Sequence, residues 1–417
     1  MKRVLKILGA VAAVFVLVLL AAIVYVLAAW DRPDKRPVLA LTAQRDSATV
    51  ARGRYLFTTT WQCFGCHQSG PANPTTPPSG GRVFDLRNTG PGFGLFYSKN
   101  ITPDSATGIG AWSDGEIVQA FREGVNKSRH TLFPIMPVDW LKELSDDDAL
   151  AIVAYLRSLP PTRNEVPPNK PSFFARALFA FNVIAPMSPV TQPIVAPPPG
   201  ITAEYGRYLS MNAAGCADCH TPRNLQDGKF YLDSLFAGSS FAFGEDENSP
   251  ASAYARNITP HASDGIGTWT EAQFVAAVTS GMRPDTTVLT PHMPYPYYKF
   301  FSAEDLRAIF LFLKTLPPIQ RAARPLQLSP AFVESRNALR GKFLFESRCQ
   351  SCHGPEGTGV AVTSVKLAEA IPIYSDTDLK EAIRTGVPDL KMPTFRKTLS
   401  EDELSDLVTY VRSWKRE

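Results

Sequence analysis

The sequence predicts an all-α protein with three tandem domains behind a single N-terminal transmembrane helix. Three observations support this prediction: a Cys-x-x-Cys-His pentapeptide that occurs three times, a helix signature that follows each copy, and one long apolar run near the N-terminus. The 417 residues are enough for several domains. The 36 prolines indicate many loops and linkers between the helices.

The apolar run predicts a membrane anchor over residues 1–36. Residues 7–30 contain no charged side chain, and a helix of this length measures about 36 Å, enough to cross a bilayer. Lys2, Arg3 and Lys6 precede the run, which puts the N-terminus in the cytoplasm and the rest of the chain in the periplasm of a bacterium. The alternative is a cleaved secretory signal. The run is longer than a signal requires, and its end at residues 26–30 matches a cleavage site poorly, so we expect a retained span in the inner membrane.

The net charge gives no support to a polyanionic partner. Three of the four net positive charges belong to the basic N-terminus, which leaves the exported part close to neutral. The sequence shows no basic stripe, so we expect no nucleic-acid partner.

The three pentapeptides match the attachment signature of c-type heme, in which two thiols bond to the porphyrin and the adjacent imidazole binds the iron. They use all six cysteines of the chain. Structural zinc is the alternative, but zinc ligands usually fall into spaced pairs, whereas here the histidine directly follows the second cysteine. The sequence therefore predicts three covalently bound c-type hemes. The expected residues are Cys63, Cys66, Cys216, Cys219, Cys349 and Cys352 for attachment, and His67, His220 and His353 for the iron.

A pair of helices recurs around each pentapeptide. A glycine precedes the pentapeptide, and a capping-box serine starts a later helix that carries an aromatic residue ten positions on. A glycine on one helix and an aromatic on the other predict a close helix crossing. In order, the glycines are Gly53, Gly206 and Gly341; the serines are Ser145, Ser302 and Ser400; the aromatics are Tyr155, Phe312 and Tyr410.

These repeats predict the domain boundaries. We expect heme domains at 45–160, 199–318 and 331–417, with Pro-rich linkers at 161–198 and 319–330. The first two domains share further segments: Asn100–Pro103 with Asn257–Pro260, and Gly108–Trp112 with Gly265–Trp269. Within the first linker, residues 173–181 are strongly apolar. This segment is too short to span a membrane; it is either an interfacial or docking helix or, as we favour, packed against the heme domains.

Each domain also offers a methionine as the second axial ligand of its iron. Met136, Met293 and Met392 are each followed by proline and lie eight or nine residues before the capping serine. Proline restricts the loop that holds a weak thioether ligand, and methionine ligation raises the reduction potential. His292, next to Met293, is the alternative ligand at the second heme. We expect the other internal methionines to belong to the core.

Four further residues are candidates for contacts around the hemes. The carbonyls of Pro103 and Pro260 could accept the Nδ1–H of the iron-binding histidine. The indole groups of Trp112 and Trp269 could donate to heme propionates or simply line the pocket. His130 and His261 are expected in loops or as propionate donors.

Taken together, these motifs resemble the triheme cytochrome c subunits of bacterial membrane-bound dehydrogenases over nearly the whole exported part. That family serves quinoprotein alcohol dehydrogenase, flavin-dependent gluconate, sorbitol and fructose dehydrogenases, and molybdenum-dependent aldehyde dehydrogenase. The resemblance implies class I-like cytochrome c domains, ligand roles for the three methionines, a catalytic dehydrogenase partner, and ubiquinone or a terminal oxidase as acceptor. The retained N-terminus departs from the alcohol and sugar members and favours the molybdenum-dependent type.

The sequence contains no candidate nucleophile, Rossmann glycine pattern or phosphate loop. We therefore expect a non-catalytic electron-transfer subunit of an oxidoreductase complex, because six-coordinate iron leaves no open position for a substrate. Two alternatives remain. A multiheme peroxidase requires a native high-spin heme, and a cytochrome subunit of a respiratory oxidase should co-purify with a catalytic membrane subunit.

Overall fold

The computed structural model of the chain describes residues 2–70, 72–225, 228–243, 251–285, 287–290, 292–324, 327–328, 330–358, 367 and 371–414. The chain divides into two compact units. Unit 1 comprises Met1–Cys219 and Phe300–Thr315, and unit 2 comprises His220–Lys299 and Leu316–Glu417. Because helix α12 groups with unit 1, this division does not coincide with the three sequence repeats, and the boundaries of three domains stay a prediction.

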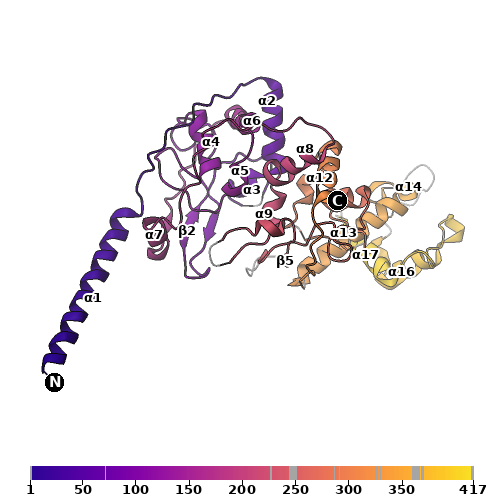
Figure 1. Cartoon of the computed structure of the whole chain (residues 1–417). Coiled ribbons are helices and arrows are strands. Elements are labelled where there is room, and N and C mark those ends of the chain that lie inside the picture. Colours follow the sequence, from indigo (N-terminus) through magenta and orange to yellow (C-terminus); the bar gives the residue numbers. More distant parts are fainter. Residues whose placement is uncertain are drawn as a thin grey trace. The chain divides into compact units, whose positions relative to one another are not determined.

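The described residues are mostly helical, which confirms the all-α prediction (Figure 1). The strands are short and form two three-stranded antiparallel sheets, with the orders β1-β2-β3 and β4-β5-β6. The elements of unit 1 are α1 Lys2–Ala29, α2 Ser47–Tyr55, η1 Leu56–Thr60, α3 Cys63–Cys66, β1 Val83–Asp85, β2 Gly94–Tyr97, α4 Asp114–Glu123, α5 Val138–Leu141, α6 Asp146–Ser158, β3 Lys170–Pro171, α7 Phe173–Ala180, α8 Ala203–Tyr208, η2 Leu209–Ala213 and α12 Ala303–Thr315.

Helix α9, Cys216–His220, contains the boundary between the two units. The elements of unit 2 are η3 Leu232–Ser234, β4 Ala242–Phe243, β5 Ala251–Tyr254, α10 Glu271–Ser280, α11 Tyr295–Tyr298, β6 Gln327–Leu328, α13 Pro330–Arg348, α14 Gln350–His353, η4 Pro355–Gly357, η5 Ile371–Ile373, α16 Asp376–Thr385, η6 Pro388–Leu390 and α17 Glu401–Arg412.

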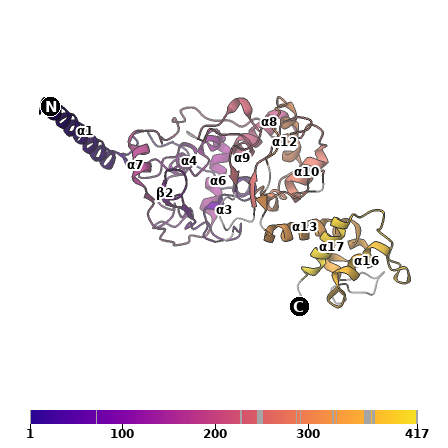
Figure 2. The same ribbon diagram turned by 90° about the horizontal axis from the view of Figure 1, so that it is seen from below.

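Helix α1 is the candidate membrane span. It has 28 residues, its most apolar window has a mean hydropathy of 3.1, and none of that window is buried against the protein. Length and composition suit a membrane-crossing helix, although a signal sequence has the same properties. Both views place α7 beside the C-terminal end of α1 (Figures 1 and 2).

The predicted close crossings of helices are present in all three repeats. Helix α2 crosses α6, α8 crosses α12, and α13 crosses α17. At each crossing the glycine faces a backbone carbonyl so closely that a Cβ atom would overlap it, and only glycine permits this approach. The distances from such a Cβ to the carbonyl oxygen are 1.8 Å for Gly53 and Ala151, 1.8 Å for Gly206 and Ala308, and 2.0 Å for Gly341 and Asp406.

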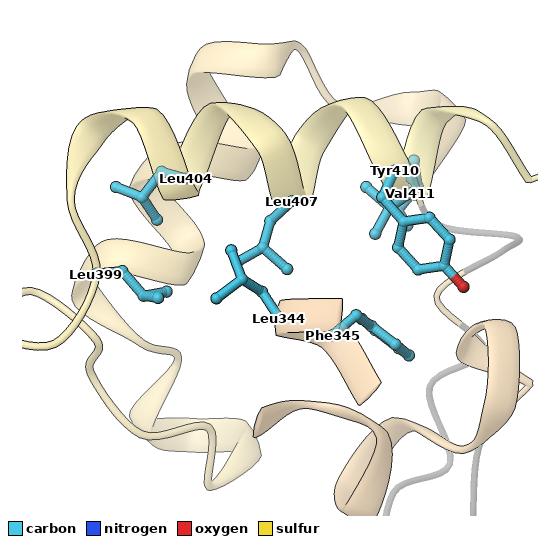
Figure 3. Packing of buried hydrophobic residues seen from close by; sticks show 8 residues of the cluster. Leu344, Phe345, Leu399, Leu404, Leu407, Tyr410 and Val411 are labelled. Carbon is cyan, nitrogen blue, oxygen red and sulfur yellow. The ribbon is translucent and has the colours of Figure 1, made fainter. Parts of the chain in front are cut away.

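The core of the third repeat shows how a sequence pattern produces such a crossing. Leu404, Leu407 and Val411 recur at helical spacing on α17 and are buried. Their side chains face Leu344 and Phe345 of α13 (Figure 3). Apolar burial across the α13–α17 crossing therefore stabilises this repeat.

The three predicted capping serines all cap their helices. The hydroxyls of Ser145, Ser302 and Ser400 accept hydrogen bonds from the backbone N–H three residues on. The complete capping box forms only at Ser400, where Glu403 accepts the serine N–H at 2.8 Å. At the other two serines the prediction of a complete box is wrong, because a tyrosine hydroxyl takes the place of the carboxylate.

Candidate heme sites

Each Cys-x-x-Cys-His segment forms about one turn of helix. In the first, the backbone N–H of His67 donates to the carbonyl of Cys63 at 2.9 Å; in the third, His353 donates to Cys349 at 3.0 Å. One turn brings residues three positions apart to the same side of the helix. All six thiols are free of disulfide bonds. Each pair of thiols is therefore available on one helix face, as attachment to a single porphyrin edge requires.

The segments that lead into the first two motifs are π-helical. Helix α2 continues into η1, Leu56–Thr60, and α8 continues into η2, Leu209–Ala213. Short π-helices are rare and often occur at functional sites. The repeat of this feature at equivalent places indicates that it helps to present the motif, and nothing in the amino-acid pattern had predicted it.

Backbone carbonyls hold the imidazoles of the first two motifs. The Nδ1 atom of His67 lies 2.8 Å from the carbonyl oxygen of Lys99, and that of His220 lies 2.7 Å from the carbonyl oxygen of Arg256. A carbonyl only accepts, so Nδ1 carries the proton and Nε2 keeps its lone pair for a metal. Burial lowers the pKa of both histidines, which favours the neutral imidazole that iron binds.

These acceptors correct the expectation for Pro103 and Pro260, because each acceptor residue lies four positions earlier in the chain. Lys99 and Arg256 directly precede the Asn-Ile-Thr-Pro segments. The repeated segment therefore does belong to the imidazole contact, but through the residue before it and not through its proline.

The asparagine of each segment explains why that carbonyl points at the imidazole. The side-chain oxygen of Asn100 accepts from the backbone N–H of Thr102 at 2.9 Å and from its hydroxyl at 2.7 Å, and Asn257 makes the same two bonds with Thr259. Such a local turn fixes the backbone around the asparagine. The preceding carbonyl is held in place as a result.

A glycine binds the backbone of the motif histidine in each of the first two motifs. The N–H of Gly80 donates to the carbonyl of His67 at 2.8 Å, and the N–H of Gly238 donates to that of His220 at 2.7 Å. Both glycines have positive φ values, +79° and +96°, which other residues adopt at a cost. Sequence reasoning missed both glycines, because they lie at different distances from the motif histidine, 13 and 18 residues after it.

The third motif is held differently. The Nδ1 atom of His353 is buried and has no hydrogen-bond partner within the described part of the chain. Burial again lowers the pKa of this histidine. The third repeat lacks the Asn-Ile-Thr-Pro segment, so its imidazole cannot be oriented by the device of the first two.

The methionine loops of the first two repeats share one geometry. The carbonyl of Met136 accepts from Val138 N–H at 2.7 Å, and that of Met293 accepts from Tyr295 N–H at 2.8 Å. The intervening prolines have φ values of −76° and −81°, which proline favours. Met392 instead forms an antiparallel bridge with Val387. All three methionine side chains are partly exposed, and their ligation stays a prediction.

Aromatic rings surround the first methionine loop. Phe133, three residues before Met136, stacks on Phe96 with ring centroids 4.1 Å apart. The rings of Phe93 and Phe179 lie 5.7 Å and 6.3 Å from that of Phe133. In the second repeat, Phe243 lies 6.4 Å from His292. These rings provide apolar surface of the kind that a porphyrin face requires.

Trp112 and Trp269 are partly buried, and the backbone around Trp112 is fixed by Arg157. The Arg157 guanidinium donates to the carbonyls of Ile109 and Trp112 and pairs with Asp114 at 3.1 Å. Arg412 of the third repeat likewise bonds two backbone carbonyls and an aspartate. Sequence reasoning missed these arginines, although each lies twelve residues after its capping serine.

The other histidines lie in local contacts. His130 Nδ1 is 3.4 Å from a carboxylate oxygen of Asp31, and His261 Nδ1 accepts from the N–H of Asp264 at 3.2 Å. His292 Nδ1 lies 3.3 Å from the Thr290 hydroxyl. No group of three or more His, Cys, Asp or Glu side chains in the described ranges could hold a metal ion.

Comparison with known families matches two parts of the chain. Residues 50–160 match the family model for cytochrome c, and residues 336–411 match that for cytochrome c oxidase, cbb3-type, subunit III. Both matched regions contain one of the pentapeptides.

Similar proteins cover most of the chain. The cytochrome c subunit of alcohol dehydrogenase (quinone) from Gluconacetobacter polyoxogenes is 28% identical over 401 residues, 90% of this chain and 82% of that protein. The gluconate 2-dehydrogenase cytochrome c subunit of Pantoea cypripedii is 27% identical over 402 residues, 89% and 87% of the two chains. A nicotinate dehydrogenase subunit of Pseudomonas putida is 29% identical over 388 residues; these are 88% of this chain but only 30% of that protein.

Proposed function

Because this chain contains cytochrome c domains and is homologous to the cytochrome c subunits of alcohol, gluconate and fructose dehydrogenases, we propose that it is the triheme electron-transfer subunit of a membrane-bound dehydrogenase. It takes electrons from a catalytic subunit in the periplasm and passes them to ubiquinone or a terminal oxidase. Helix α1 anchors it in the bacterial inner membrane.

The observation that carries this proposal is the repeated hydrogen bond between a motif imidazole and a backbone carbonyl. It occurs at His67 and His220 with nearly the same length, 2.8 Å and 2.7 Å. The bond leaves Nε2 unprotonated and strengthens the imidazole as a ligand. Neutral imidazoles beside pairs of cysteines that form no disulfide bond are the donor set that covalently bound heme needs.

Each residue then has a defined role toward its heme. The thiols of each motif would attach the porphyrin, and the motif histidine and a methionine would bind the iron. Heme supplies one-electron redox chemistry, and the protein sets its potential by the ligands and their hydrogen bonds. The residues proposed to hold each iron are His67 with Met136, His220 with Met293, and His353 with Met392. Trp112 and Trp269 are proposed to donate to heme propionates or to line the pocket.

The identity of the electron donor is the open part of the proposal. The relatives include proteins named for alcohol, gluconate and nicotinate dehydrogenases. We propose a catalytic dehydrogenase partner, with a molybdenum-dependent aldehyde dehydrogenase first and an alcohol or sugar dehydrogenase next. Purification of the membrane complex in mild detergent identifies the partner directly.

Three measurements test the proposal. Intact-mass analysis should show three heme additions, and each variant Met136→Ala, Met293→Ala and Met392→Ala should convert one low-spin heme to high spin. The subunit alone should not be reduced by aldehyde, alcohol or sugar, whereas the complex should be reduced by the donor's substrate. Fewer than three hemes, or substrate-driven reduction of the isolated chain, contradicts the proposal.

A second candidate rests on the match of residues 336–411 to an oxidase subunit family. In that case the chain belongs to a respiratory oxidase and delivers electrons to its catalytic membrane subunit. Co-purification with an oxidase in place of a dehydrogenase favours this candidate.

A further inference from the structure

Helix α7 exposes several large apolar side chains. Phe173 and Phe174 of α7 and its C-cap residue Phe181 lie within an arc of about 100° of helix surface, since each residue advances the helix by about 100°. The exposed fractions of the α7 region are 50% for Phe173, 41% for Phe174, 58% for Phe181 and 69% for Val183. Removing phenylalanine side chains from water is favourable, so this surface favours an apolar environment.

The end of the candidate membrane helix packs directly against α7. Val26, Ala29 and Ala180 form a small buried cluster. The Tyr25 hydroxyl donates to the carbonyl of Ala180 at 3.1 Å, and its ring centroid lies 5.4 Å from that of Phe181. The exposed apolar surface of α7 therefore adjoins α1, whose residues 7–30 carry no charged side chain on any face.

Two arginines lie on aromatic rings at the same end of α1. The guanidinium of Arg32 is 5.1 Å from the centroid of Tyr25, and that of Arg176 is 5.0 Å from the centroid of Trp30. Tyrosine and tryptophan concentrate at membrane–water interfaces, and basic groups there reach lipid phosphates. The composition of this end matches the headgroup level of a bilayer.

The chain beyond α1 is fixed to the first repeat by a strap, which we define as residues 34–43. Arg36 pairs with the fully buried Glu123 at 2.9 Å and donates to the carbonyl of Met187 at 2.6 Å. Asp34 N–H donates to the carbonyl of Arg129 at 2.7 Å, and Ala43 N–H to Asp114 at 3.0 Å. The strap is not a free linker, so the anchor and the first repeat are connected without slack.

Helix α7 is fixed to the first repeat as well. The Ser172 hydroxyl donates to the carbonyl of Gly92 at 2.6 Å, and Ser172 N–H donates to that of Phe93 at 2.9 Å. The rings of Phe174 and Phe93 lie 5.8 Å apart. These contacts prevent α7 from turning its exposed phenylalanines inward.

We propose that α7 and the last turn of α1 together form a platform that seats the first heme domain in the outer-leaflet interface of a phospholipid bilayer. The inference rests on the proposed role of α1 as an anchor. Phe173, Phe174, Phe181 and Val183 enter the acyl boundary, while Arg32 and Arg176 contact headgroup phosphates. The occupant of the exposed α7 face is lipid, because the face continues the surface of a membrane-spanning helix.

The test uses the full-length heme-loaded protein in vesicles of phosphatidylcholine and phosphatidylglycerol that carry a diazirine on one acyl chain. After irradiation, mass spectrometry should find lipid adducts in α1 and in residues 173–183. Adducts confined to α1 overturn the platform but leave the anchor standing. Absence of adducts from both segments shows that α1 does not span the bilayer.

A matched pair of variants sharpens the test. Phe173→Ser/Phe174→Ser/Phe181→Ser should reduce labelling of residues 173–183 to that of the peptide containing Leu232, an apolar residue of unit 2 that is 65% exposed. Leu225→Ser/Leu232→Ser should leave labelling of 173–183 unchanged. An unaltered heme spectrum in both variants shows that they fold. Two results overturn the proposal. In the first, the Leu232 peptide is labelled as strongly as residues 173–183, so the labelling is not specific to the α7 surface. In the second, adding the purified dehydrogenase removes the labelling of residues 173–183, which assigns this surface to the partner protein.

Discussion

The hydroxyl of Tyr208 donates a 2.7 Å hydrogen bond to the carboxylate of Asp148, which lies in the first turn of the last helix of the preceding repeat. The reciprocal hydrogen bond is also present: the hydroxyl of Tyr55 in the first repeat donates to the carboxylate of Asp305 in the second at 2.6 Å. The same hydroxyls accept the N–H of Ser145 at 3.2 Å and of Ser302 at 3.3 Å. The first two repeats therefore cap each other's last helices.

Removing either hydroxyl should destabilise unit 1. Tyr55→Phe should cost about 1.5–3 kcal/mol, the usual value of a hydrogen bond to a charged group. Tyr208→Phe should cost less, because Arg52 also binds Asp148, at 2.7 Å and 2.8 Å. Thermal unfolding of the heme-loaded variants measures both effects, with Tyr374→Phe, at an exposed site, as the control. Equal losses in all three variants would show that the exchange contributes nothing specific.

The same tyrosines should make stability depend on alkaline pH. Burial, together with Asp305, raises the pKa of Tyr55, and burial together with Asp148 raises that of Tyr208. The unfolded tyrosines ionise near a pKa of about 10, while the folded ones keep their protons. Their stabilisation is therefore complete below pH ~10 and is lost as the pH rises further. Between about pH 8 and about pH 11, the temperature midpoint of unfolding should fall less steeply with pH in the double variant Tyr55→Phe/Tyr208→Phe than in the unaltered protein.

Alanine should not be tolerated at the three helix crossings. A Cβ atom at Gly53, Gly206 or Gly341 would lie 1.8 Å to 2.0 Å from a backbone carbonyl oxygen, so the helices must separate. We expect losses of about 3 kcal/mol or more, at the upper end for overpacking. The control is Gly9→Ala in α1, where nothing lies within 4 Å. Thermal unfolding and heme content measure the outcome, and a neutral Gly53→Ala would contradict the crossing.

Loss of Asn100 should change the potential of the first heme. Without the turn that Asn100 fixes, the Lys99 carbonyl no longer holds His67, and a less basic imidazole stabilises ferric iron less. If the bond is worth about 1 kcal/mol, the potential of that heme should rise by about 40 mV. Spectroelectrochemical titration of Asn100→Ala measures the shift. Pro103→Ala should leave the potential unchanged, since its carbonyl is not the acceptor; a matching shift there would restore the proline assignment.

The first two Cys-x-x-Cys-His segments come close to each other at Trp61, two residues before Cys63. Its indole N–H donates to the carbonyl of Asn212 at 2.9 Å, and its ring lies where a Cβ of Gly215 would come within 2.5 Å. Gly215→Ala should therefore push the two segments apart and slow electron equilibration between the hemes after flash reduction. Trp61→Ala in the same chain should restore part of the stability lost by Gly215→Ala. Independent, additive losses would show that the two residues do not interact.

The sequence was sufficient for the features that depend on local pattern. The glycine and aromatic offsets predicted the helix crossings correctly, and the capping serines marked the helix starts. The features that it did not predict depend on tertiary pairing. In the sequence Glu123 looks like any other helix residue, because its ion pair with Arg36 forms only in the folded chain. The carbonyl of Lys99 reaches His67 only because Asn100 fixes the turn that follows it.

The strap at residues 34–43 has a consequence for how electrons travel. A carrier on a slack tether swings between donor and acceptor and covers the distance by diffusion. Here the bonds of Arg36 to Glu123 and to the carbonyl of Met187 prevent such motion of the first repeat relative to the strap. On the proposal that α1 spans the membrane, the strap keeps the first repeat at one height above the lipid, and an electron donor has to approach it there.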